Sequence, residues 1–238
     1  MQLVTNNLNE TNKKLVLTMT GEVLQPVRVY YDVKDNKAVK KIFSKLKCVE
    51  FDSTRNRQVW LYQKESKKIK FEKPYLSIPL EHRPIVIGSF FTCSNKEMYL
   101  EVRSIERAIE GIIFFDKHIK KYMAKVTDIS IINKLFSGSE NTTNFDSLFD
   151  NATIINPEKN IDELNAFVDQ GKSIGSFFEE KKKNTLPEVE RFPSHYYEDG
   201  IEILTYTLKS RQYVAMQHWK GNKDYTLGDY ISKIASLA

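Results

Sequence analysis

The sequence predicts an α+β fold in which a mixed or antiparallel sheet, or more than one sheet, is layered against a few helices. Three observations support this fold class. Short segments with the period of two that is typical of strands recur along the chain. Two segments carry apolar residues at the 3.6-residue period of an amphipathic helix. The two kinds alternate as β-β-α-β-β and then β-β-α-β, so we expect the fold to be ferredoxin-like in part.

The first unit ends near residue 62. The elements expected are strands over 15–20, 27–33, 48–51 and 58–62 and a helix over 35–46. Asp35 is a typical N-cap for that helix. Its apolar residues lie on one face, at i, i+3, i+4 and i+7: Val39, Ile42, Phe43 and Leu46. The last two strands are expected to form a hairpin.

The second unit follows a basic connector over 64–84 that contains three prolines. The elements expected are strands over 85–91, 98–103 and 126–132 and a helix over 104–122. This helix has the clearest signal in the chain. Ser104 is its expected N-cap, and its apolar stripe consists of Ile105, Ala108, Ile109, Ile112, Phe115, Ile119 and Tyr122.

The rest of the chain begins with a turn-rich, acidic segment over 137–160, which we interpret as a linker. The elements expected beyond it are a short helix over 161–168, a hairpin of strands over 201–208 and 212–219, and a closing helix from Thr226. Thr226 and Asp229 have the spacing of a capping box. The charge run over 179–183 is interpreted as an exposed turn or helix end.

Charge is distributed unevenly along the 238 residues. Residues 1–137 hold 25 Lys and Arg against 15 Asp and Glu, a net charge of +10, whereas residues 138–238 hold 11 against 16, a net charge of −5. We therefore expect two regions. The first is a basic α+β domain over 1–137, and the second is an acidic linker with a smaller α+β region over 138–238.

The composition also bears on location. With 41% apolar residues the chain can bury a core without disulfides. Its start lacks the charged and apolar regions of a signal peptide, and its apolar runs are far shorter than the roughly 18 residues of a membrane span. Cys48 and Cys93 stand alone in their segments, as in proteins of reducing compartments. We expect a soluble, cytoplasmic protein with no membrane partner.

Two patterns resemble ligand sites but lack the context that such sites need. Residues 166–173 match a relaxed phosphate-loop pattern, yet the segment before them looks helical and the intervening residues are bulky. His195, next to Glu198 and Asp199, could meet His218 in space, but no histidine has the spacing of a metal site. We therefore expect no cofactor and no metal site.

An enzymatic interpretation remains as the third alternative. Asp52 followed by Glu65 and Lys67 has the residue types of a metal-dependent nuclease. The segment around Glu65, however, lacks the apolar alternation of a core strand. Cys48 and Cys93 have no basic neighbour to activate a nucleophile. The sequence favours a protein that is not an enzyme.

The basic and aromatic residues of the first half carry the main functional prediction. Lysine and arginine neutralise phosphates, and exposed aromatic rings stack on bases. The residues expected to bind nucleic acid are Lys37, Lys40, Lys41, Lys45, Arg55, Arg57, Trp60, Lys67 and Lys68. In the competing interpretation, the sheet buries Trp60 and the lysines are ordinary solvated residues.

We therefore expect a non-enzymatic intracellular binding protein with nucleic acid as its ligand. The alternative is a protein–protein adaptor or a subunit of an assembly. Its docking segment would be residues 138–170, which hold seven acidic residues and one lysine and would bind a basic partner.

Overall fold

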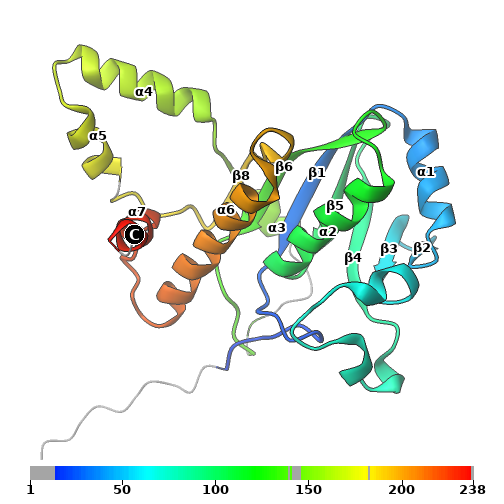
Figure 1. Cartoon of the computed structure of the whole chain (residues 1–238). Helices are drawn as coiled ribbons and strands as arrows, with labels where there is room; N and C mark the ends of the chain where they lie inside the picture. The colour runs from blue at the N-terminus through cyan, green and yellow to red at the C-terminus, as the bar shows by residue number, and fades with distance from the viewer. Residues whose placement is uncertain (1–13, 139, 141–145, 182, 237–238) are drawn as a thin grey trace, which may run out of the picture.

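An eight-stranded sheet in the order β2-β3-β4-β5-β1-β6-β8-β7 carries the fold (Figure 1). The structure is a computed structural model that describes residues 14–138, 140, 146–181 and 183–236. All neighbouring strands are antiparallel except β7 and β8, which are parallel. The strands are β1 (Val27–Val33), β2 (Val49–Asp52), β3 (Arg57–Leu61), β4 (Val86–Thr92), β5 (Glu97–Val102), β6 (Ala124–Ile132), β7 (Thr153–Ile154) and β8 (Val189–Pro193).

Helices cover one face of this sheet and flank its ends. The helices are α1 (Asn36–Lys45), α2 (Ile105–His118), α3 (Asp146–Phe149), α4 (Pro157–Asp169), α5 (Ile174–Lys181), α6 (Tyr196–Trp219) and α7 (Leu227–Ala235), with short 3₁₀ turns η1 (Lys64–Lys68), η2 (Tyr75–Ser77) and η3 (Leu80–His82). Helices α2 and α6 lie side by side in front of the sheet, whereas α1 flanks its β2 end (Figure 1). The α+β class with a mixed sheet is confirmed.

The central strands follow the ferredoxin-like connection order. Leaving out the β2–β3 hairpin, the chain runs β1-α1-β4-β5-α2-β6, and these four strands are ordered β4-β5-β1-β6 with antiparallel neighbours. This is the split β-α-β-β-α-β arrangement. The β2–β3 hairpin extends the sheet beyond β4 and places α1 at its outer end.

The core lies between the sheet and α2. Except for Tyr122, which lies beyond the helix end and is 72% exposed, the stripe predicted for α2 is buried, with Ile105, Ile112 and Phe115 each 0% exposed. Ser104 caps the helix by accepting a hydrogen bond from the Arg107 backbone N–H at 3.1 Å. At Gly111 a Cβ atom would lie 2.8 Å from the Leu100 side chain, so the absence of a side chain there allows α2 to pack this closely on β5. The helix ends at His118 and is shorter than predicted.

Three predicted strands, over 15–20, 201–208 and 212–219, are wrong. Residues 201–219 form most of α6 and not a hairpin. No turn-forming residue separates the two apolar runs, and the buried residues Leu204, Leu208 and Ala215 follow the helical period. Packing on α2 and the sheet thus overrides the β propensity of these runs. Residues 15–20 make only isolated bridges, Leu15 with Ser137 and Leu17 with Val23.

The region beyond residue 137 is more structured than predicted. It supplies β7 and β8, and β8 pairs with β6 from Asp128 opposite Pro193 to Ile132 opposite Val189. Both charge regions therefore share one sheet, and their division into separate units stays a prediction. The capping box at Thr226 is present, with the Thr226 backbone N–H donating to Asp229 Oδ2 at 2.8 Å. In the described part of the chain, no helix has the combined length and apolarity that crossing a membrane requires.

Candidate nucleic-acid interface

Helix α1 presents its lysines to solvent because its apolar face packs on the sheet. Val39 and Phe43 are buried, and the Asp35 side chain caps the helix by accepting a hydrogen bond from the Ala38 backbone N–H at 2.9 Å. The lysines on its other side are all exposed: Lys37, Lys40, Lys41 and Lys45. The amphipathic pattern of the sequence thus places them on one outward surface.

The 3₁₀ turn η1 lies beside the end of α1 and adds further lysines. The Lys47 backbone N–H donates to Glu65 Oε1 at 3.2 Å, and the Gln63 side-chain amide donates to the Lys47 carbonyl at 3.3 Å. These bonds fix the start of η1 beside Lys47. Lys64, Lys67 and Lys68 are exposed on η1, with the Lys67 ammonium 4.5 Å from the centroid of the Tyr75 ring. We call the exposed lysines of α1, Lys47 and η1, together with Arg55, the basic edge.

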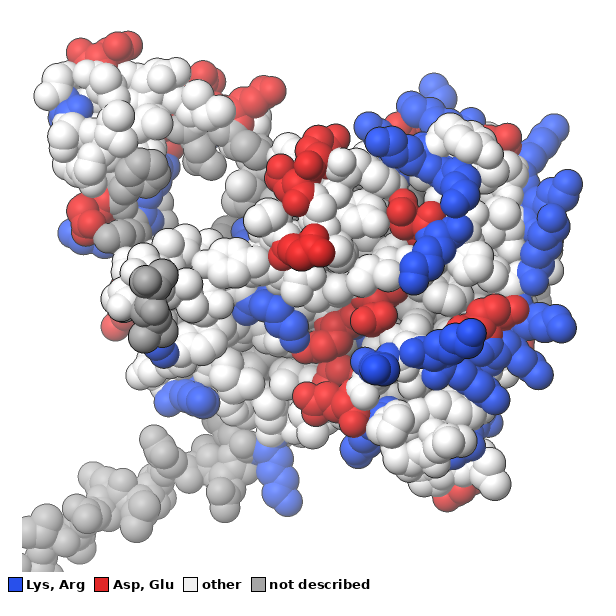
Figure 2. Space-filling model, viewed as in Figure 1, with Lys and Arg blue, Asp and Glu red and all other residues white. Residues whose placement is uncertain are grey.

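Two acidic residues lie among the lysines of the basic edge, since Glu65 accepts from the Lys47 backbone N–H and Glu50 accepts from the Gln63 side-chain amide. Among the ion pairs of the described residues, none involves a lysine of this edge. Figure 2 shows the blue side chains gathered on the right of the molecule, where Figure 1 places α1 and the β2–β3 hairpin. The structure therefore brings the predicted lysines of both segments onto one continuous surface.

The β2–β3 hairpin carries the two predicted arginines. Asp52 shapes its loop by accepting hydrogen bonds from the backbone N–H groups of Thr54 and Arg55. Arg57 forms an ion pair with Asp52 at 3.0 Å and lowers the pKa of that carboxyl. Arg57 is therefore fixed against the sheet, whereas Arg55 is exposed.

A pocket of about 720 Å³ lies between α1, this hairpin and the β4–β5 turn. Its lining combines amide side chains with one cationic residue from α1, one cationic residue from the hairpin and an exposed aromatic ring. We call it the amide pocket; these lining residues are Asn36, Asn56, Gln58, Asn95, Lys40, Arg57 and Phe51. Phe51 is 60% exposed. Lys40 and Arg57, predicted from distant segments, are thus brought together here.

Trp60 does not belong to this surface. Its side chain is 0% exposed and packs against Phe114 and Phe115, with ring centroids 5.5 and 5.0 Å away. Its indole is therefore unavailable for stacking on a base, which corrects that part of the predicted site. The ring that the sequence reasoning missed is Phe51. The only signal for it was its place opposite Gln58 in the predicted hairpin.

The face of the sheet opposite α2, on which α3 packs, holds a second aromatic group. Tyr30, Tyr99 and Phe91 stand opposite one another across β1, β5 and β4. Phe91 stacks on Tyr99 at 5.2 Å, and the Arg191 guanidinium lies 3.7 Å from the Tyr30 ring centroid. Arg57 is the next residue in this row, opposite Phe91 on β3. The row therefore ends at the hairpin that borders the amide pocket.

The residues considered for metal-dependent chemistry are not assembled. Asp52 lies at the loop end of β2, whereas Glu65 contacts Lys47 at the opposite end of that strand. His195 precedes α6, whose backbone is non-helical at Gly200, and His218 lies near the other end, about 25 Å along the helix axis from Ile201 at 1.5 Å per residue. Within the described residues, no group of three or more His, Cys, Asp or Glu side chains is placed to hold a metal ion.

The relaxed phosphate-loop pattern has no phosphate-binding geometry. Helix α4 precedes it where such a loop needs a strand, and Gly171, with φ of +74°, follows the helix end in a left-handed conformation. The Lys172 ammonium lies over the Phe167 ring, 4.5 Å from its centroid. This segment therefore ends a helix.

Comparison with known proteins adds no family to this description. No protein-family model matches the sequence, and neither a curated protein nor a solved structure is significantly similar to it. The functional argument therefore rests on the arrangement of the residues themselves.

Proposed function

We propose that the protein binds single-stranded nucleic acid along the basic edge, with unpaired bases held in the amide pocket. The observation that carries this proposal is the position of Phe51. Its ring is 60% exposed inside a pocket lined by Lys40 and Arg57. An exposed aromatic ring in a pocket that also has cationic residues in its lining is the combination that holds a base by its face and the adjoining backbone by its phosphates.

The lysines of the basic edge supply the phosphate contacts. Each lysine that approaches a phosphate releases condensed counterions, which favours binding to any sequence. Since no acid of the described chain pairs with these lysines, binding does not first have to break ion pairs. The surface is therefore suited to backbone contacts that are independent of sequence.

The amides of the pocket supply contacts of a second kind. Asparagine and glutamine side chains can donate to and accept from the edge of a base. Asn36, Asn56, Gln58 and Asn95 line the pocket beside Phe51. Stacking and edge contacts of this kind require a base that is free of its partner strand. We therefore propose that the ligand is a single-stranded nucleic acid and not a duplex.

Salt-dependent binding tests the phosphate contacts. Replacing Lys40 and Lys41 by alanine should weaken binding of an oligonucleotide of any sequence, because two phosphate contacts are lost. The slope of log K against log salt should flatten by about one to two units. Fluorescence anisotropy with a labelled single strand, repeated at several salt concentrations, measures both the affinity and the slope.

The matched control is the double replacement Lys220→Ala and Lys223→Ala. These lysines are exposed beyond the end of α6, far from the basic edge. These two replacements remove the same charge and should leave the slope of log K against log salt unchanged. If the wild-type protein shows no binding at low salt, where charge attraction is least screened, the proposal is wrong.

A second experiment isolates the stacking contact. Phe51→Ala should weaken binding by about 1–3 kcal/mol without unfolding the protein, because the ring is mostly exposed. Tyr122→Ala removes another exposed ring, 72% exposed between α2 and β6, and should change nothing. If the two variants bind the oligonucleotide with equal affinity, the amide pocket does not hold a base.

The adaptor interpretation is favoured by one specific observation. Helix α4 stands to the side of the sheet (Figure 1) and exposes apolar side chains of the 138–170 segment, with Ile161 at 59% and Val168 at 42%. Exposed apolar residues on such an acidic segment suit a partner that is basic around an apolar patch. Ile161→Asp should abolish the capture of a stoichiometric basic partner while leaving oligonucleotide binding intact.

A further inference from the structure

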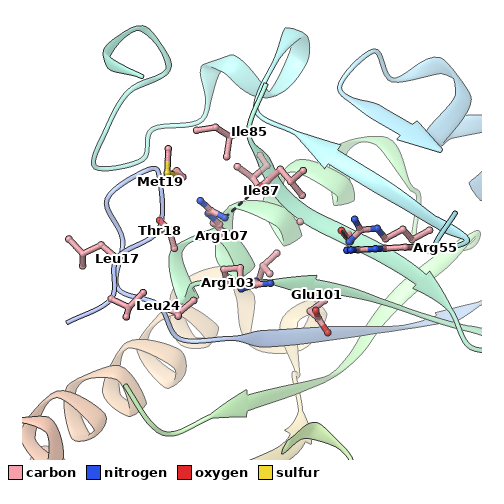
Figure 3. A pocket seen from close by; sticks show the side chains of 16 residues that line it. Leu17, Thr18, Met19, Leu24, Arg55, Ile85, Ile87, Glu101, Arg103 and Arg107 are labelled. Carbon is pink, nitrogen blue, oxygen red and sulfur yellow. Dashed lines mark hydrogen bonds between the residues drawn. The ribbon is translucent and has the colours of Figure 1, made fainter. Parts of the chain in front are cut away.

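A second cleft, of about 460 Å³, opens at the end of the sheet near the N-terminal segment (Figure 3). Its basic side consists of four guanidinium groups. Two come from the β2–β3 hairpin, one from the end of β5 and one from the first turn of α2: Arg55, Arg57, Arg103 and Arg107. We call this the arginine cleft. None of its defining features depends on the lysines of the basic edge.

Positive charge exceeds negative charge in this cleft. Glu101 is the one acidic residue of its lining, and its carboxylate is already held by Arg28, whose Nε donates to it at 2.9 Å. Burial lowers the pKa of Arg103, an effect that Glu101 opposes and that the nearby charge of Arg57 reinforces. Burial also lowers the pKa of Arg107, to about 10, with Arg103 adding to the shift. Arg103 thus lies close to two other guanidinium groups.

Two of the arginines are fixed before any ligand arrives. Arg107 is buried, and its Nη2 donates to the Thr20 hydroxyl at 2.6 Å, with Glu22 3.6 Å from its Nε. Arg57 donates through Nη1 to the Ser89 hydroxyl at 3.1 Å. Arginines held in this way lose little side-chain entropy when they bind an anion.

The other side of the cleft is apolar and accessible. Leu17 and Met19, in the loop that Figure 3 shows facing the arginines, are 52% and 50% exposed. Val86 adds a third apolar side chain, 45% exposed, at the start of β4. A ligand that fits this cleft therefore has an anionic end for the arginines and an organic group for Leu17 and Met19.

We infer that the arginine cleft binds a phosphate monoester, with the dianionic phosphate on Arg103 and Arg57 and the organic group against Leu17 and Met19. Arginine forms paired hydrogen bonds with phosphate oxygens. A monoester carries nearly two charges at neutral pH, which suits a site with several cations and few acids. A phosphate monoester of this kind can come from two sources, a small metabolite or the phosphorylated end of a nucleic-acid strand.

Titration calorimetry with methyl phosphate tests the phosphate end. Arg103→Gln should weaken its binding about 10- to 100-fold, because a charged hydrogen-bond donor is lost. Lys125→Gln, an exposed lysine on β6, removes the same charge elsewhere and should have no effect. Dimethyl phosphate, which bears a single charge, should bind more weakly than methyl phosphate. Affinity for methyl phosphate should rise from pH 5 to 7.5 as its second proton leaves.

Hexyl phosphate tests the apolar side. Its longer chain should bind at least about tenfold more tightly than methyl phosphate, and Met19→Gln should reduce that advantage. Equal binding of the two esters would contradict the role of Leu17 and Met19. Equal binding of methyl phosphate by the wild-type and Arg103→Gln proteins would overturn the site itself.

Oligonucleotides distinguish the two sources. If a strand with a 5′ or 3′ phosphate binds more tightly than its unphosphorylated form, and Arg103→Gln removes the difference, the natural ligand class is a strand end. If the phosphate makes no difference while hexyl phosphate still binds, the ligand class is a small monoester. Because the small esters are measured without nucleic acid, failure of the proposed function leaves this test intact.

Discussion

The two cysteines occupy opposite environments, although neither has a partner sulfur among the described residues. Cys48 is 0% exposed at the start of β2, and burial together with the nearby Glu65 carboxylate raises the pKa of its thiol to about 12. Cys93 is exposed and lines the amide pocket, although burial and the Glu97 carboxylate raise the pKa of its thiol as well. Only a thiolate reacts with alkylating reagents, so access and pKa both protect Cys48.

Alkylation should therefore separate the two residues. Iodoacetamide at pH 8 is expected to modify Cys93 in the folded protein and Cys48 only after denaturation, as read by mass spectrometry of tryptic peptides. The Cys93→Ser variant serves as the control, because its folded form should take up no label. Rapid labelling of Cys48 without denaturant would show that the start of β2 opens readily.

Aromatic residues show what alternation can and cannot predict. The period of two correctly indicated that Trp60 and Tyr62 belong to a strand region, but whether a helix covers their face depends on where α2 packs. Trp60 meets Phe114 and Phe115 from a segment more than fifty residues away. Such contacts are not written in the local pattern. The hairpin could therefore be predicted as part of the site, whereas the choice of ring could not.

At the scale of elements, the strength of the local signal decided how well each could be predicted. Helix α2 has a cap and an uninterrupted stripe, and α1 has the same features in shorter form. In α6 the apolar residues also satisfy a strand pattern, and only packing selects the helix. Strand β8 is five residues long, ends at Pro193 and is recognised only by its pairing with β6.

The predicted stripe of α2 yields a stability test. Ile112→Ala should lower the free energy of unfolding by about 2–5 kcal/mol, because it leaves a cavity at a residue that is 0% exposed. Ile161→Ala on α4, where the side chain is 59% exposed, should change it by less than about 0.5 kcal/mol. Urea unfolding monitored by tryptophan fluorescence gives the free energy of unfolding of each variant for comparison with the wild-type protein. Similar small losses for both would place α2 outside the core.

At the scale of the whole molecule, β6 connects the two charge regions. On one side it pairs with β1, and on the other with β8. The Glu190 side chain of β8 is 1% exposed and accepts a hydrogen bond at 2.7 Å from the side-chain amide of Asn133, which directly follows β6. Breaking this boundary would leave a buried charge without this hydrogen bond. The acidic and basic regions are therefore joined by both backbone and side-chain contacts.

The two regions should consequently unfold together. We expect one transition in calorimetry, with a van't Hoff enthalpy equal to the calorimetric enthalpy. The Arg211→Ala variant should lower its midpoint, because the Glu190 carboxylate stays buried without its cationic partner and keeps only the hydrogen bond from Asn133. Two resolved transitions in the wild-type protein would instead support independent domains over 1–137 and 138–238.

Arg57 lines both the amide pocket and the arginine cleft. This one hairpin residue, whose guanidinium is fixed by Asp52 and Ser89, thus belongs to the lining of two cavities. Its charge cannot be neutralised twice, so an anion bound on one side reduces the attraction left for an anion on the other. Thermodynamic linkage requires this antagonism to be reciprocal, with each occupant weakening the other by the same factor. A single hairpin residue would then make the occupancy of either cavity dependent on the concentration of the other cavity's ligand.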